Sequence, residues 1–235
     1  MGGVSIDPVT KNVFAASGNS WPTSATSGQH IDYAEHVISL TSGAKVIGTN
    51  YPGLPNTDSD FGATPVLFRP TGCALMTAVS NKDGYLYFYN AASIASGSFA
   101  RILMANPGTG DFNNGPAFDA STQMLYETSS SDTASGVVPA YKHGLTAFSF
   151  RNCRPVLTFN VAEGALDDNY SSPTVANGVV YFGAGSTNRY YANDARTGAL
   201  LWTSPLLAGS AQISPMVVNG RLYVVAGGWI YAYGL

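Results

Sequence analysis

Charged side chains are scarce in this chain. Only 11% of its 235 residues are Asp, Glu, Lys or Arg, the net charge is −3, and no cluster of Lys and Arg occurs. Proteins that bind nucleic acid or an anionic membrane surface usually carry such a cluster, so the composition argues against both partners. No apolar run approaches the roughly 20 residues that a helix needs to span a bilayer. The opening residues, MGGVSIDPVT, have neither the basic start nor the apolar stretch of a signal peptide.

Cysteine and histidine are equally scarce. Cys73 and Cys153 lie far apart and have no neighbours with metal-ligand spacing. They could form a disulfide, which would suit an oxidising compartment, or be two buried free thiols. His30, His36 and His143 lack the spacing of a zinc site. The chain also has no Gly-x-Ser-x-Gly motif, phosphate loop or dinucleotide fingerprint, so it shows no signature of those enzyme classes.

Glycine and tyrosine, in contrast, are abundant, with 26 and 14 copies. Together with the low charge, this composition is typical of many short strands joined by tight turns. All-β domains of about this length often form a single core. We therefore expect one domain over residues 1–235.

The C-terminal third repeats itself. Ser172-Pro173 returns as Ser214-Pro215, and Asn177-Gly178 returns as Asn219-Gly220, in both cases 42 residues later (214 − 172 and 219 − 177). A period of roughly 40–50 residues with several strands in each unit is typical of β-propeller blades.

Each repeat has the same order of elements. A short apolar strand is followed by a tight turn, a second strand ending in small residues, a Tyr-rich third strand, and a turn leading to a fourth. The order can be followed through residues 4–49, 64–105, 115–161, 171–202 and 213–235. The sequence therefore predicts an all-β propeller of antiparallel four-stranded blades, with four full blades and a last blade of three strands.

The ends of this array leave three architectures open. The outer blades would present uncovered faces and edges, which favour association. The chain could form a five-bladed ring, be completed by another chain, or be part of a larger propeller. Trp202 and Trp229 are expected to pack between blades.

Three segments of the N-terminal half carry a family resemblance. They are GGVSIDPVTKNVFAASGNSWP (2–22), LPNTDSDFGATPVLF (54–68) and AVSNKDGYLYFYN (78–90). With the DARTGALLW turn, they resemble dehydrogenases that depend on pyrroloquinoline quinone (PQQ), the quinoprotein alcohol dehydrogenases. The polymer-oxidising members, such as polyvinyl alcohol dehydrogenases, are the nearest in kind. The resemblance implies the C-terminal part of an eight-bladed propeller.

The resemblance also implies a metal site. Asn19 matches a ligand of the Ca²⁺ that clamps the quinone, and Asp60 matches a ligand that is also the proposed catalytic base. Asp58 lies where some relatives carry a further acidic ligand that suits a lanthanide. Oxygen ligands of this kind suit a hard cation. Each of the three residues could instead belong to an ordinary turn.

The cofactor contacts follow from the same resemblance. Lys82 matches the cation that contacts the quinone oxygens. Its local sequence, NKDG, is equally typical of an ordinary turn. Asn113 or Asn114 matches an Asn-containing loop that faces the cofactor. In an up-and-down blade, loops after second strands and before first strands open on one face. Asn19, Lys82, Asp60, Asn113 and Asn169 should therefore share a face, where a pocket could form.

Some family features have no counterpart here. A second carboxylate ligand, a disulfide between adjacent cysteines and the tryptophan beneath the cofactor are all missing, so the chain is expected to supply about half a site. The implied function is oxidation of a small or polymeric alcohol by hydride transfer to PQQ, with Ca²⁺ as Lewis acid.

The resemblance further implies a periplasmic or secreted parent and a cytochrome c-type electron acceptor. Self-association, or a missing N-terminal half, would complete the ring. The alternative is a non-catalytic propeller that acts as a scaffold for protein partners.

Overall fold

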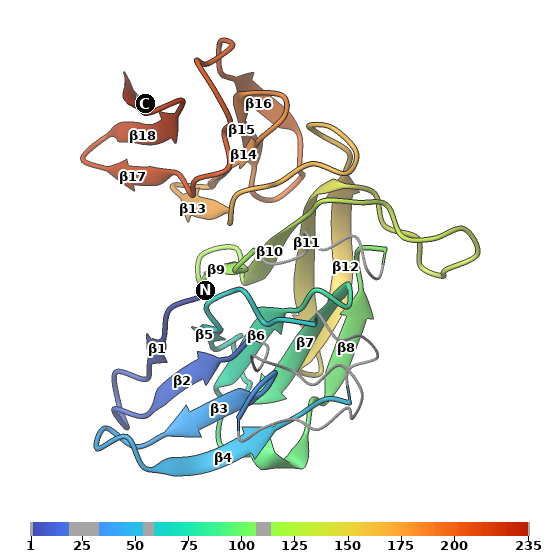
Figure 1. The fold of residues 1–235 in the computed structure, drawn as a ribbon, viewed down its shortest axis with the longest axis vertical. Coiled ribbons are helices and arrows are strands. Elements are labelled where there is room, and N and C mark those ends of the chain that lie inside the picture. Colours follow the sequence, from blue (N-terminus) through green and yellow to red (C-terminus); the bar gives the residue numbers. More distant parts are fainter. Residues whose placement is uncertain (1, 19–32, 54–58, 107–113, 235) are drawn as a thin grey trace. The chain divides into compact units, whose positions relative to one another are not determined.

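The computed structural model describes residues 2–18, 33–53, 59–106 and 114–234. Over these residues the chain forms antiparallel sheets in which each strand pairs with the next along the sequence (Figure 1). We call these sheets blades 1 to 5. They are blade 1, with β1 (Ser5–Ile6), β2 (Val13–Ala16), β3 (Val37–Leu40) and β4 (Val46–Asn50); blade 2, with β5 (Val66–Phe68), β6 (Met76–Ser80), β7 (Tyr85–Asn90) and β8 (Ala100–Leu103); blade 3, with β9 (Ala117–Asp119), β10 (Met124–Ser129), β11 (Gly144–Arg151) and β12 (Arg154–Val161); blade 4, with β13 (Thr174–Ala176), β14 (Val179–Ala184), β15 (Arg189–Asp194) and β16 (Leu200–Thr203); and blade 5, with β17 (Met216–Val218), β18 (Arg221–Ala226) and β19 (Trp229–Gly234).

The chain divides into two compact units. Residues 1–115 contain blades 1 and 2, and residues 116–235 contain blades 3 to 5. The helical content of the described residues is one 3₁₀ turn, η1 (Ile94–Ser96). No helix in the described part of the chain is long and apolar enough to cross a membrane. The single domain expected from the sequence stays a prediction.

The repeated Asn-Gly pairs form the tight hairpins that the sequence predicts. Asn177 and Gly178 have φ of 52° and 78°, and Asn219 and Gly220 have φ of 49° and 70°. Two successive positive φ values define the type I′ turn, whose twist matches that of the strands it joins. These turns set the register of β13 with β14 and of β17 with β18.

Tyrosines join neighbouring blades in the second unit. The Tyr126 hydroxyl of β10 donates to the Ala195 carbonyl of blade 4 at 2.8 Å. The Tyr190 hydroxyl of β15 lies 2.8 Å from the carbonyl of Ile213, in the segment before blade 5. It lies 2.9 Å from the carbonyl of Val225 in β18 of blade 5. Both tyrosines are fully buried. A buried phenol is tolerated when its hydroxyl donates a hydrogen bond. These rings therefore pack in the apolar core and also form hydrogen bonds between blades.

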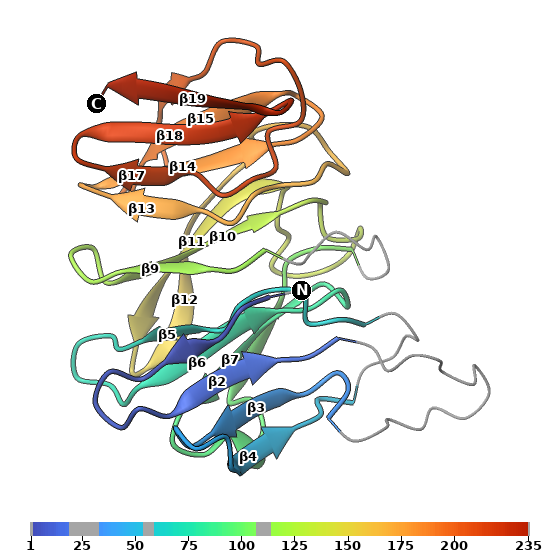
Figure 2. The same cartoon turned by 60° about the vertical axis from the view of Figure 1, so that its left-hand side comes forward.

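The predicted propeller fold is confirmed, including four four-stranded blades and a three-stranded last blade. Figure 2 shows blade 5, at the top, beside β13–β15 of blade 4. Trp202 packs between these two blades, with its ring 5.0 Å from that of Tyr233. The expectation for Trp229 is wrong, because 66% of this residue is exposed. Trp229 begins β19, which pairs with β18 on one side and with no described strand on the other.

Candidate functional site

Two of the predicted site residues meet in the first unit. Asp60 lies before β5, Lys82 follows β6, and the Lys82 Nζ donates to Asp60 Oδ2 at 2.8 Å. The Lys82 backbone N–H also donates to the Asp60 carbonyl, at 3.1 Å. The Asp60 side chain is 25% exposed and the Lys82 side chain is 19% exposed. This is a partly buried ion pair that a small molecule in solvent can still approach.

The end of β2 forms the floor beneath Asp60. A Cβ placed on Gly18 would lie only 2.6 Å from Asp60 Oδ1, so the carboxylate rests directly on the glycine backbone. The Phe61 N–H donates to the Ser17 carbonyl at 3.3 Å, and the Phe61 ring is buried against Tyr87 with centroids 5.8 Å apart. Burial of this neighbouring side chain fixes the direction of the short segment that carries Asp60.

Asn81 and Asp83 hold the turn that carries Lys82. Asn81 Nδ2 donates to the Ser59 carbonyl at 2.8 Å, and Asn81 Oδ1 accepts the Asp83 N–H at 2.8 Å. The Asp83 carboxylate in turn accepts hydrogen bonds from the Tyr85 N–H and the Tyr87 hydroxyl. Burial raises the pKa of Asp83, although these hydrogen bonds oppose the shift. Neither residue is among those predicted from the sequence, although the Asn-x-Asp-Gly turn pattern is a signal that points to them.

Asn114 also belongs to this end of the blade. It is buried, and its carbonyl accepts a hydrogen bond from the Ser80 hydroxyl at the end of β6, two residues before Lys82. The structure therefore brings Asp60, Lys82 and Asn114 to the β6 end of blade 2. Asn19, Asp58 and Asn113 lie outside the described residues, and their roles stay predictions.

The same arrangement recurs in the second unit at Asn169. Its carbonyl accepts the N–H of Gly185, which directly follows β14, at 2.8 Å. A residue before a first strand thus meets a residue after the second strand in blade 4 as well. The expectation that all five residues share one face stays a prediction.

The described residues do not by themselves form a site for Ca²⁺ or a lanthanide. They contain no group of three or more His, Cys, Asp or Glu side chains that could hold a metal ion. Asp60 offers one carboxylate, and its Oδ2 accepts the Lys82 ammonium. Because Ca²⁺ takes six to eight oxygen ligands, Asp60 alone would not hold it.

Both cysteines are disulfide-bonded, which decides between the two alternatives that the sequence left open. No free thiol is present among the described residues. His143 is engaged with Asp132, its Nδ1 lying 2.8 Å from Oδ1.

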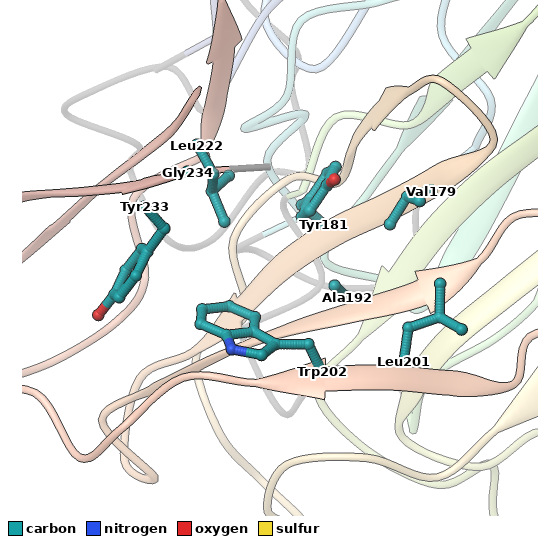
Figure 3. A pocket seen from close by; sticks show the side chains of 8 residues that line it. All are labelled: Val179, Tyr181, Ala192, Leu201, Trp202, Leu222, Tyr233 and Gly234. Carbon is teal, nitrogen blue, oxygen red and sulfur yellow. The ribbon is translucent and has the colours of Figure 1, made fainter. Parts of the chain in front are cut away.

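A cavity of about 340 Å³ lies elsewhere, between blades 4 and 5. Figure 3 shows its lining, in which the rings of Tyr181, Trp202 and Tyr233 surround a space bordered by aliphatic side chains. The full lining is Val179, Tyr181, Ala192, Leu201, Trp202, Leu222, Tyr233 and Gly234. It contains no carboxylate or ammonium, so it offers no group for acid–base chemistry.

Comparison with known proteins identifies relatives of this fold. No family model matches the chain. Among curated proteins it is 23% identical over 230 residues to a tetrathionate hydrolase from Acidithiobacillus ferrooxidans, a match that covers 93% of this chain and 44% of the hydrolase.

Solved structures of several other proteins have a similar fold. They include a europium-containing methanol dehydrogenase (TM-score 0.68, 14% identity, 95% of this chain and 50% of the other), quinohemoprotein alcohol dehydrogenase from Comamonas testosteroni (0.67, 14%, 97% and 44%) and BamB from Moraxella catarrhalis (0.61, 16%, 98% and 57%). The likeness is one of fold. The chain spans about half the length of these proteins, so the activity of the whole protein is a matter for proposal.

Proposed function

We propose that this chain provides the acid–base half of an alcohol dehydrogenase site that uses PQQ. The observation that supports this most directly is the contact between Asp60 and Lys82, 2.8 Å apart. Two separate segments suggested these residues, one as a base and one as a cofactor contact. Their meeting at one blade end is what a shared site requires.

The residues fit an anionic quinone in chemical type. When bound, PQQ would supply the two-electron acceptor for the hydride that leaves the alcohol carbon. Lys82 would hold an anionic or carbonyl oxygen with a compact positive charge. Asp60 would take the hydroxyl proton of the alcohol as general base, so that the alcohol loses one proton and one hydride and becomes a carbonyl compound. Asn113 or Asn114 would face the cofactor, and Asn19 and Asp58 would complete a Ca²⁺ or lanthanide site with Asp60.

The wider setting is part of the same proposal. The parent protein would have further blades, lie in the periplasm or be secreted, oxidise a small or polymeric alcohol, and pass electrons to a cytochrome c-type acceptor. Self-association is also proposed, because Met216, Trp229 and Ile230 of blade 5 are 59%, 66% and 74% exposed. Exposed apolar patches favour such contacts.

PQQ uptake tests this proposal. The chain is titrated with PQQ in the presence of Ca²⁺, and binding is followed by the quinone absorbance. Loss of a charge-assisted contact worth about 1.5–3 kcal/mol should weaken binding roughly 10- to 100-fold in Lys82→Met. Lys142→Met is the matched control, because Lys142 pairs with Asp132 in the other unit. A folded protein that takes up no PQQ would favour the scaffold function instead.

A second candidate function is hydrolysis of a sulfur oxyanion. The match to a tetrathionate hydrolase across 93% of this chain favours it. Tetrathionate is a dianion, which Lys82 would attract, and Asp60 could activate water. Consumption of tetrathionate without PQQ, lost in Asp60→Asn, would support this function over the dehydrogenase.

A further inference from the structure

Blade 4 contains a structural counterpart of Asp60. Asp60 lies six residues before β5, which begins at Val66, and Asp168 lies six residues before β13, which begins at Thr174 (66 − 60 and 174 − 168). In blade 2 the partner is Lys82, the second residue after β6. The second residue after β14 is Ser186, and its N–H donates to Asp168 Oδ1 at 2.7 Å. The repeat thus places a carboxylate against the same turn in both blades.

The two carboxylates differ in what faces their second oxygen. In blade 2, Asp60 Oδ2 accepts the Lys82 ammonium. In blade 4, Asp168 Oδ1 accepts the N–H groups of Asn169 and Ser186, both at 2.7 Å. Asp168 Oδ2 is buried and has no hydrogen-bond donor among the described residues, and the residue as a whole is only 4% exposed. A buried carboxylate oxygen without a partner carries a desolvation cost.

Oxygen atoms gather around Gly185, beside this carboxylate. A Cβ placed on Gly185 would lie 2.7 Å from Ser210 Oγ, 3.0 Å from the Asn169 carbonyl oxygen and 3.3 Å from Asp168 Oδ1. All three nearest atoms are therefore oxygens. A cluster of carboxylate, carbonyl and hydroxyl oxygens is the donor set that hard cations prefer. Because Gly185 has no side chain, all three oxygens can lie against its backbone.

We propose that Asp168, with the Asn169 carbonyl and the Ser210 hydroxyl, binds a singly charged inorganic cation such as Na⁺ or K⁺. The cation is expected to carry one positive charge, because that neutralises one buried carboxylate. A divalent cation would leave the site with a net positive charge. Blade 2 provides the internal precedent, in which the corresponding carboxylate pairs with one ammonium group. This site is separate from the alcohol dehydrogenase function proposed above.

The test is thermal unfolding at constant ionic strength, with K⁺ or Na⁺ replacing tetramethylammonium, a bulky cation that oxygen ligands do not coordinate directly. The Tm of the wild-type chain should rise with the small cation and then saturate, because a ligand that binds the native state stabilises it. Asp168→Asn, which keeps the acceptor for both N–H groups, should lose this response. Asp167→Asn, which removes the charge of an exposed neighbour, should retain it.

Ser186→Lys adds an independent check, because its ammonium should occupy the cation position as Lys82 does in blade 2. Its Tm should no longer depend on the small cation. Crystals soaked in Tl⁺ should show an anomalous peak at Asp168. The proposal is overturned if wild-type Tm is the same in both salts, if Asp167→Asn loses the response as fully as Asp168→Asn, or if Tl⁺ does not bind at Asp168. The wild-type Tm comparison and the Tl⁺ experiment do not require the Asp168→Asn variant to fold.

Discussion

Gly18→Ala tests how the Asp60–Lys82 pair is built. The new Cβ would lie 2.6 Å from Asp60 Oδ1 and 3.4 Å from Cγ. Because non-bonded heavy atoms prefer separations of about 3.5 Å, the carboxylate must move by roughly 1 Å. The φ of Gly18 is not in the left-handed region, so alanine introduces no backbone strain there. The substitution therefore acts on the carboxylate alone.

The expected cost follows from the ion pair. A movement of this size takes Asp60 Oδ2 from 2.8 Å to beyond hydrogen-bond range of Lys82 Nζ. A partly exposed ion pair contributes about 1 kcal/mol to the free energy of unfolding, which is at the upper end of the range for surface ion pairs. We expect Gly18→Ala to lower the free energy of unfolding by about 1 kcal/mol through this loss.

A double-mutant cycle in urea isolates the effect. In a Lys82→Met background the pair is already absent, so Gly18→Ala should cost only about 0.3 kcal/mol. Gly43→Ala serves as a control, because its new Cβ would meet nothing closer than the Thr41 hydroxyl at 3.8 Å. Equal costs in the wild-type and Lys82→Met backgrounds would refute the reasoning, since the glycine would then act independently of Lys82.

Three further predictions concern the second unit. Desolvation opposes ionisation of Asp132, but hydrogen bonds from Lys142 and His143 outweigh it and lower the pKa of Asp132 from 3.8 to about 2. A carboxyl whose pKa is lowered in the folded state stabilises the protein above pH 4, and this contribution is lost as the pH falls toward 2. Asp132→Asn should therefore cost about 1 kcal/mol at pH 7, after allowance for solvent screening, and much less at pH 2 in urea titrations. The pKa of Glu127 is shifted in the opposite direction. Burial raises it well above 4.5, so the stability that the protonated carboxyl group provides is lost as the pH rises. Glu127→Gln should raise the stability at pH 7 by roughly 1–3 kcal/mol but not at pH 4, and a decrease at pH 7 would contradict this. Finally, Gly183→Ala would place a Cβ 2.0 Å from the Ala211 carbonyl oxygen, so the Tm should fall with a loss of about 3 kcal/mol or more. Wild-type stability in this variant would mean that the two backbones are not in contact.

The sequence predicts the strands well because their signals are local. The Asn-Gly pairs determine the hairpins, and alternation of apolar residues determines which strand faces are buried. Trp229 shows the limit of this reasoning, because its residue type predicts burial but its exposure depends on which strands flank β19. Residue type alone does not contain that information.

The candidate site was predictable only in part. Family resemblance gave Asp60 and Lys82, which then met in the structure. The bond from Asn81 to the Ser59 carbonyl joins positions 22 residues apart, and it exists only once blade 2 has closed. The equivalence of Asp168 with Asp60 was hidden because the first hairpins of blades 2 and 4 differ in length. Such relations need the strand pairing, which a linear pattern does not give.

The most direct test of the central claim is alcohol-dependent dye reduction by the chain loaded with PQQ and Ca²⁺, compared with Asp60→Asn. If Asp60 is the general base, Asp60→Asn should retain PQQ absorbance while turnover falls by about 10²–10⁴-fold. Turnover that is unchanged in Asp60→Asn, with PQQ bound, would contradict the assignment of this site.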